Sequence, residues 1–304
     1  MLSANQLRQV GNRSGARDIS NVEIDVILTH LLQLFYEKGL TAHLAFKGGT
    51  MLRKMVFGPR GRLSTDLDFT CRTEAGTDDL LLMMILDVLA EPYHGITFRF
   101  DKDKDWYVTE DSCSANPVCS HTDNQKGHKI KLQVSTRERP ILSVNEMQQM
   151  QQDYFKLLPF QPAAIPCLAF EEAVAEKIRA ASQRSKIRDL HDLCEISTRA
   201  LRRDLIRSLA VLKLWNSGGP GLDFGRLRAR IQDGGGYDIG ELRNLLRKDQ
   251  NPDLKSMIQR VIDGFQFLNN LTALERTLAT DAAQRCRKEA DQLFRQIGES
   301  GKDG

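Results

Sequence analysis

The sequence predicts an α+β protein with a mixed sheet in its N-terminal half and helices through most of its C-terminal half. Before residue 165, short runs with strand-like alternation stand between segments of helical periodicity, which describes an α/β or α+β domain. After Pro159, Pro162 and Pro166, almost every segment has helical periodicity. A chain of 304 residues is long enough for two domains of ordinary size. We therefore expect one domain at 1–165 and a helical domain at 166–304.

The elements of the first domain follow from apolar spacing and from helix breakers. Residues 1–17 show little periodicity and are expected to form a loose leader. Ser20 is expected to cap a helix that runs to Lys38 and ends at Gly39. The other elements are expected as strands at 44–46, 64–70, 96–100, 106–110 and 128–136, helices at 50–56 and 78–91, and a turn at 58–62.

Composition indicates a soluble globular protein, with 41% hydrophobic and 27% charged residues. The longest apolar run, Leu80 to Leu86, is too short to span a bilayer. The first residues lack the apolar core of a signal peptide, and the six cysteines are widely spread, as in a protein with reduced thiols. We expect a cytoplasmic protein without a membrane partner.

Positive charge is concentrated in one stretch, although the net charge is only +3. Between Lys177 and Arg207 the sequence has nine Lys or Arg residues and four acidic ones. This local excess is large enough to favour a polyanionic partner.

The DLD triplet predicts a pair of carboxylates on one face of a strand. Residues two apart in a strand project to the same side, so Asp66 and Asp68 would lie together while Leu67 and Phe69 enter the core. A divalent cation removes the repulsion between two such carboxylates, and Mg²⁺ held by carboxylates and substrate phosphates is common in phosphoryl transfer. The alternative is an ordinary polar strand face.

A glycine turn precedes this pair. Gly48, Gly49 and Thr50 follow a strand and open a helix, where backbone N–H groups favour a phosphate. Lys54 lies four residues after Thr50, where its ammonium could reach a triphosphate. The turn differs from a Walker A loop, and its glycines could instead serve close packing alone.

The order of these motifs resembles a known family. KGGTMLRK at 47–54, followed by RLSTDLDF at 62–69, is similar to the AbiEii/MenT-type nucleotidyltransferase toxins, which are related to polymerase-β-type nucleotidyltransferases. The helix beginning SNVEIDVILTHLL also resembles the segment before the glycine motif, and the resemblance resumes at FEEAVAEKIRAASQRSKIRDLHDL, residues 170–193. It implies a polymerase-β-like nucleotidyltransferase domain followed by a helical domain.

The resemblance also implies site residues. Those expected to hold the nucleotide are Gly48, Gly49, Thr50, Lys54 and Ser64, and those expected to act in catalysis are Asp66, Asp68, Lys177 and Asp192, with Asp66 and Asp68 as the Mg²⁺ ligands. Lys177 could neutralise a triphosphate, and Asp192 could orient Lys177 or accept a proton from the attacking hydroxyl. Asp189 is a rival for that role, three residues earlier on the same helix face. Where related sites often have a third carboxylate, this sequence has the neutral Gln133.

The implied function is a toxin that transfers NMP from an NTP to the 3′ end of a tRNA, blocks translation and growth, and is controlled by a cognate antitoxin. Two alternatives stay open: nucleotidyl transfer to a small molecule such as an antibiotic, and nucleotide or RNA binding without catalysis. A zinc site is a further alternative at Cys113, Cys119, His121 and His128, although their spacing fits no familiar zinc finger.

Overall fold

The structure is a computed structural model that describes residues 1–73 and 78–301, and it divides into two compact units. The first unit contains residues 1–140, 144–167 and 243–251, and the second contains 141–143, 168–242 and 252–304. We call Arg243–Asn251 the return segment, because it belongs to the first unit while the chain on both sides of it belongs to the second. This return was not predicted from the sequence.

The first unit is built on a mixed seven-stranded sheet, in agreement with the predicted fold class. Its order is β4 (Trp106–Thr109), β5 (Ser112–Ala115), β8 (Lys131–Ser135), β2 (Asp66–Cys71), β1 (Leu44–Lys47), β10 (Ile165–Cys167) and β9 (Asn145–Met147). The central strand β2 is parallel to β8 and antiparallel to β1. A three-stranded sheet has the order β3 (Ile96–Arg99), β6 (Val118–His121) and β7 (Asn124–Lys129). The single strand predicted at 128–136 is therefore wrong, since β7 and β8 lie in different sheets.

Helices of the first unit flank these strands. They are α1 (Ala4–Ser14), α2 (Ile19–Glu37), α3 (Gly48–Met51), the π-helix η2 (Leu52–Phe57), α4 (Asp78–Val88), α5 (Lys102–Asp105) and the 3₁₀ turns η1 (Leu40–Ala42), η3 (Gly58–Arg60) and η4 (Phe155–Leu157). The predicted loose leader is wrong, because Ser3 and Gln6 form a capping box that starts α1 and its residues Leu7 and Val10 are buried. Asp18, rather than Ser20, caps α2.

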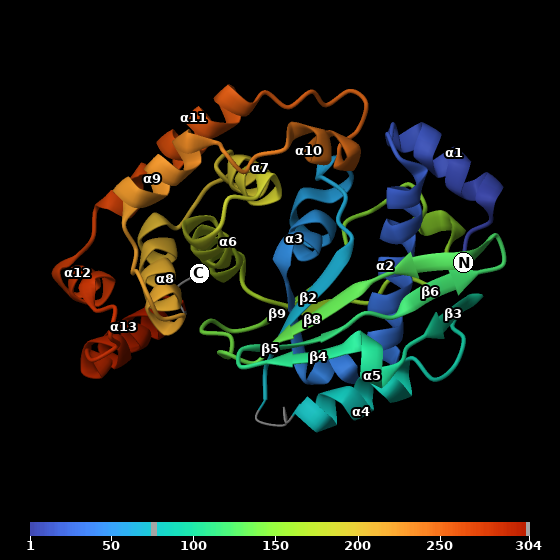
Figure 1. The fold of residues 1–304 in the computed structure, drawn as a ribbon, viewed down its shortest axis with the longest axis horizontal. Coiled ribbons are helices and arrows are strands. Elements are labelled where there is room, and N and C mark those ends of the chain that lie inside the picture. The colour runs from blue at the N-terminus through green and yellow to red at the C-terminus, as the bar shows by residue number, and fades with distance from the viewer. Residues whose placement is uncertain (74–77, 302–304) are drawn as a thin grey trace. The chain divides into compact units, whose positions relative to one another are not determined.

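The core of this unit lies on one face of β1 and β2. The ring of Phe69 in β2 lies 5.2 Å from Phe46 in β1 and 5.9 Å from Phe35 in α2, measured between ring centroids. All three side chains are buried. Because side chains alternate along a strand, Asp66 and Asp68 are left on the opposite face of β2. Helix α3 contacts this strand, and the two elements lie side by side in Figure 1.

The return segment is hydrogen-bonded to two loops of the first unit. The Leu63 N–H, just before β2, donates to the carbonyl of Leu245 at 2.8 Å, and the Lys248 N–H donates to the carbonyl of Gly15 at 2.7 Å. The Gln250 side chain donates to the carbonyl of Arg60 at 3.0 Å. The chain leading into the carboxylate strand is thus fixed by residues far away in the sequence.

The second unit is helical. Its elements are α6 (Phe170–Gln183), α7 (Ile187–Ile196), α8 (Arg203–Asn216), α9 (Phe224–Asp233), most of α10 (Ile239–Leu245), α11 (Leu254–Gly264), η5 (Gln266–Asn269), α12 (Ala273–Thr280) and α13 (Arg287–Ser300). Helix α6 packs against α7 and α8, and α8 contacts α12 and α13. Among the described residues, none of the helices is long and apolar enough to cross a membrane.

Candidate active site

The carboxylate pair lies on a polar face of the central strand. Asp66 and Asp68 are half-buried, while Leu67 between them is fully buried. In the register of the sheet, Asp68 is opposite Lys47 of β1 and beside Gln133 of β8, and Asp66 is beside Lys131. Neighbours in register project to the same face, so the two carboxylates lie in a row with two lysines and an amide.

The glycine turn touches this pair directly. Gly48 has φ +79°, a conformation that side chains disfavour, and a Cβ atom built on it would lie 2.3 Å from Oδ2 of Asp68. Glycine is thus required here both by the backbone angle and by the approach of the carboxylate. The structure brings together the two motifs that the sequence analysis joined only by order.

Thr50 fastens the turn to the carboxylate strand. Its side chain is buried, and its hydroxyl donates a hydrogen bond to the backbone carbonyl of Asp66. Because the hydroxyl is occupied by this bond, the structure shows Thr50 holding the turn against β2.

The lysine and aspartates of the second motif block form a buried ion-pair group in the second unit. Lys177 of α6 places Nζ 2.8 Å from Oδ2 of Asp192 and 3.1 Å from Oδ1 of Asp189, both in α7. Arg184 donates to the second oxygen of Asp189 at 2.8 Å. Burial alone would raise the pKa of Asp189, but Lys177 and Arg184 outweigh it and hold that pKa below its usual value. Asp192 is therefore the closer partner of Lys177, and Asp189 is shared.

Comparison with known proteins now identifies the family. Residues 30–280 match the family described as nucleotidyl transferase AbiEii toxin of type IV toxin–antitoxin systems. This chain belongs to that family. The resemblance inferred from the KGGT and DLD motifs is confirmed.

Solved structures show a shared fold. The chain is similar to MenT4, a nucleotidyltransferase toxin from Mycobacterium tuberculosis, with 23% identity and a TM-score of 0.81 over 98% of this chain and 100% of that one. It is also similar to JHP933 from Helicobacter pylori, with 20% identity and a TM-score of 0.50 over 83% of this chain and 95% of that one. No curated protein matches significantly. At these identities the structural likeness supports the AbiEii-type fold alone.

Lys54 of this AbiEii-family chain does not face the open side of the turn. The side chain is fully buried, and its ammonium donates to Oδ1 of Asp25 at 2.9 Å, to Thr29 at 2.8 Å and to the Tyr154 hydroxyl at 3.2 Å. The expected position four residues after Thr50 assumed an α-helix, but the helix becomes a π-helix at Leu52, which changes the direction of each later side chain. Lys54 is therefore not part of the open side of the glycine turn.

Two further observations bear on the predicted nucleotide site. Ser64 is buried just before β2, so its hydroxyl is enclosed by the protein. The sequence analysis missed Asp25 and Tyr154, the partners of Lys54. An acidic residue inside the apolar run IDVILTHLL was the available signal, because a buried carboxylate needs a cationic or hydrogen-bonding partner.

The donor set fits Mg²⁺ with the help of substrate oxygens. Asp66, Asp68 and the side-chain oxygen of Gln133 offer hard oxygen ligands on one face, the kind that Mg²⁺ prefers. Within residues 1–73 and 78–301 there is no group of three or more His, Cys, Asp or Glu side chains that could hold a metal. A cation here would therefore depend on the two carboxylates and on the phosphates of a bound nucleotide.

Three of the four residues considered for zinc have other partners. The Cys113 thiol donates to the carboxylate of Asp78 at 3.0 Å. His121 and His128 place Nε2 at 2.9 Å and 3.1 Å from the same oxygen of Glu23. These contacts join helices to strands and give the zinc alternative no support.

Proposed function

We propose that this chain transfers a nucleoside monophosphate from an NTP to an RNA hydroxyl, with the 3′ end of tRNA as acceptor. The transfer would block translation in the cytoplasm, and a cognate antitoxin would control it. The observation that carries the proposal is the contact between Gly48 and Asp68, which puts a phosphate-sized turn beside a carboxylate pair.

The residues divide the chemistry between them. The N–H groups of the turn at Gly48–Thr50 hold the phosphates of the NTP, and Asp66 and Asp68 hold Mg²⁺. When bound, the ion would neutralise negative charge that develops on the phosphates. The attacking hydroxyl forms a bond to the α-phosphorus, the bond between that phosphorus and the bridging oxygen breaks, and pyrophosphate leaves.

Lys177 would neutralise the triphosphate, and Asp192 would orient the Lys177 side chain. The contact of 2.8 Å between Lys177 and the buried Asp192 carboxylate favours an orienting role over proton acceptance, because a carboxylate committed to an ammonium is a weak base. The proton of the attacking hydroxyl is then released to solvent.

Pairing within the protein reduces the positive charge that the sequence places after Lys177. At least five of the nine basic residues of that stretch form ion pairs, with partners that include Glu176, Glu241 and Glu275 outside it: Lys177, Arg179, Arg184, Arg188 and Arg207. The support for an RNA acceptor therefore comes from the family. Gln133 beside Asp68 favours a second candidate, a nucleotide or RNA binder without turnover.

A single assay separates these candidates. Purified protein is incubated with Mg²⁺, tRNA and each of four labelled NTPs, and label on the RNA 3′ end is measured. We expect incorporation by the wild type, a loss of about 10²-fold or more in Asp66→Ala, and wild-type activity in Asp87→Ala, which removes an exposed carboxylate from α4. Incorporation that is equal in Asp66→Ala and the wild type would refute the proposal, and nucleotide binding without incorporation would support the second candidate.

A further inference from the structure

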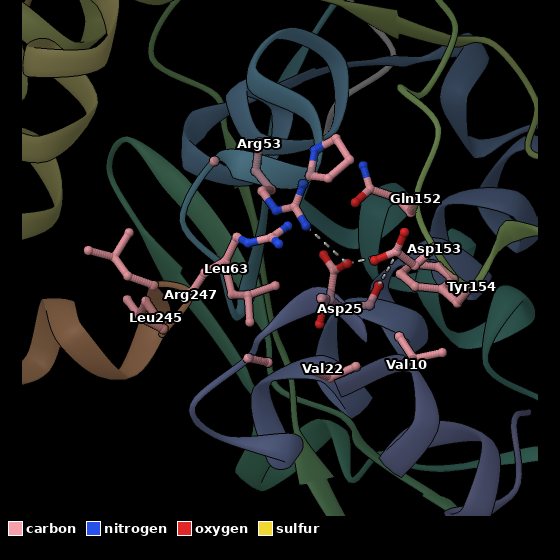
Figure 2. Close-up of a pocket in the computed structure, with 15 residues that line it drawn as sticks. Val10, Val22, Asp25, Arg53, Leu63, Gln152, Asp153, Tyr154, Leu245 and Arg247 are labelled. Carbon is pink, nitrogen blue, oxygen red and sulfur yellow. Dashed lines mark hydrogen bonds and ion pairs between the residues drawn. The ribbon is translucent and has the colours of Figure 1, made fainter. Parts of the chain in front are cut away.

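A buried polar network stands behind the phosphate turn. Its members are Asp25 and Thr29 of α2, Lys54 of η2 and Tyr154, and each has at most 3% of its surface exposed. Asp25 accepts from Lys54 at 2.9 Å through one oxygen and from the Tyr154 hydroxyl at 2.8 Å through the other. Figure 2 shows Asp25 between Arg53 and Tyr154. We call this group the Asp25 network.

Two neutral hydroxyl groups complete the hydrogen bonding of the network. The Thr29 hydroxyl lies 2.8 Å from both Lys54 Nζ and the Tyr154 hydroxyl. Burial raises the pKa of Tyr154, and the charge of Asp25 raises it further, so that the phenol stays protonated and can donate to the carboxylate. A cavity of about 30 Å³ beside Asp25 and Arg53 has room for about two water molecules and for nothing as large as a nucleotide. The network is thus part of the protein's interior.

Its position along the chain ties the network to the turn. Helix α3 starts at the turn and continues without a break into η2, which carries Lys54. Thr50 fixes the first residues of this helix to β2, and Lys54 fixes the next turn to α2 and Tyr154. The backbone carbonyl of Lys54 also accepts from the N–H of Met150 at 2.8 Å. The helix axis, and with it the direction of the N–H groups at the turn, is therefore held at two points.

A π-helix lies at this second point. A π-helical turn is rare, because its wider hydrogen bonding is less favourable than that of an α-helix, and it is found frequently at functional sites. An ammonium whose three N–H groups lie within hydrogen-bonding distance of four buried oxygens gives the local compensation that such a turn requires.

We infer that Asp25, Thr29, Lys54 and Tyr154 are positioning residues for the phosphate turn: they set the direction of its N–H groups from behind and do not touch the nucleotide. The inference depends on the proposed function for the identity of the ligand, an NTP. The inference assigns Lys54 a role different from the nucleotide binding expected from the sequence, because the Lys54 ammonium is paired with the Asp25 carboxylate.

Two mild variants test the inference. Tyr154→Phe removes the hydroxyl that contacts Asp25 and Thr29, and Thr29→Val removes a contact to Lys54 at nearly constant volume. The matched control is Glu23→Gln, which weakens contacts of the same helix α2 to His121 and Asn124 in the β6–β7 hairpin. Each protein is measured for thermal unfolding, for amide hydrogen exchange in the segment 47–54, and for the Kd of Mg·NTP.

We expect both network variants to speed exchange in segment 47–54 by about threefold or more and to raise the Kd about tenfold, because small displacements of binding groups are costly. Glu23→Gln should lower the unfolding temperature and leave both values unchanged. Exchange at the wild-type rate in both network variants, or equal acceleration in Glu23→Gln, would overturn the inference. If exchange responds as expected but the wild type binds no nucleotide, the proposed function fails and the positioning of the turn is still supported.

Discussion

Replacing Gly48 by alanine tests the contact on which the active-site proposal depends. Two costs can be worked out. A residue with a Cβ at φ +79° costs about 1–2 kcal/mol in backbone energy. The new Cβ would lie 2.3 Å from Oδ2 of Asp68 and has to reach about 3.4 Å for ordinary contact, so the carboxylate and the turn must separate by about 1 Å. A displacement of that size at reacting groups can lower the rate about 10²-fold.

Gly39→Ala is the matched control. Gly39 has φ +75°, almost the same angle, and apart from its two chain neighbours no heavy atom of the described chain lies within 4 Å of a Cβ built there. The unfolding temperature of both variants should fall by a few degrees, because both place a Cβ at a positive φ angle. Only Gly48→Ala should lose nucleotidyl transfer, measured as label incorporated into tRNA, and Mg·NTP affinity, measured by calorimetry. Equal activity in the two variants would show that the approach of Gly48 to Asp68 has no functional role.

Two further predictions concern the face of β2 that carries Asp66 and Asp68, and an ion pair in the second unit. Gln133→Asp puts a third carboxylate beside Asp68, so Mn²⁺ affinity measured by electron paramagnetic resonance should rise about tenfold; unchanged affinity would place the cation elsewhere. Asp189 has a lowered pKa in the folded state, so its ion pairs stabilise the protein above the unfolded-state pKa and lose effect as the pH falls through the folded-state value. The difference in unfolding free energy between wild type and Asp189→Asn should therefore be constant at neutral pH and shrink below about pH 4; a difference that persists there would contradict the assignment.

Features with a local cause could be predicted from the sequence. The face of the DLD strand follows from side-chain alternation, and the structure has Leu67 buried and Asp66 half-buried as expected. The length of α2 follows from its apolar residues and from Gly39 after it. Gln133 was expected at the position of a third carboxylate, and the register of β2 and β8 places it beside Asp68.

Features with a non-local cause could not be predicted. The first helix is an exception with a local cause: its mostly polar sequence shows periodicity only at Leu7 and Val10, but the capping box of Ser3 and Gln6 that starts it could have been read from the sequence. The direction of Lys54 depends on a π-helix and on Asp25 and Tyr154, which lie 29 residues before and 100 residues after it. Hydrophobic periodicity compares residues that are close in the sequence, so it cannot reveal partners this far away.

The return segment has a consequence for the order in which the protein can mature during synthesis. The N–H of Leu63 finds its acceptor at Leu245, so the ribosome must add 182 more residues (245 minus 63) before that hydrogen bond can form. At about 5–20 residues per second this takes roughly 10–40 s. A nascent chain that stops before residue 243 contains the glycine turn and both aspartates, yet its entry into β2 is unfinished. Aborted translation products of this toxin would accordingly be incomplete at the very strand that carries the acids.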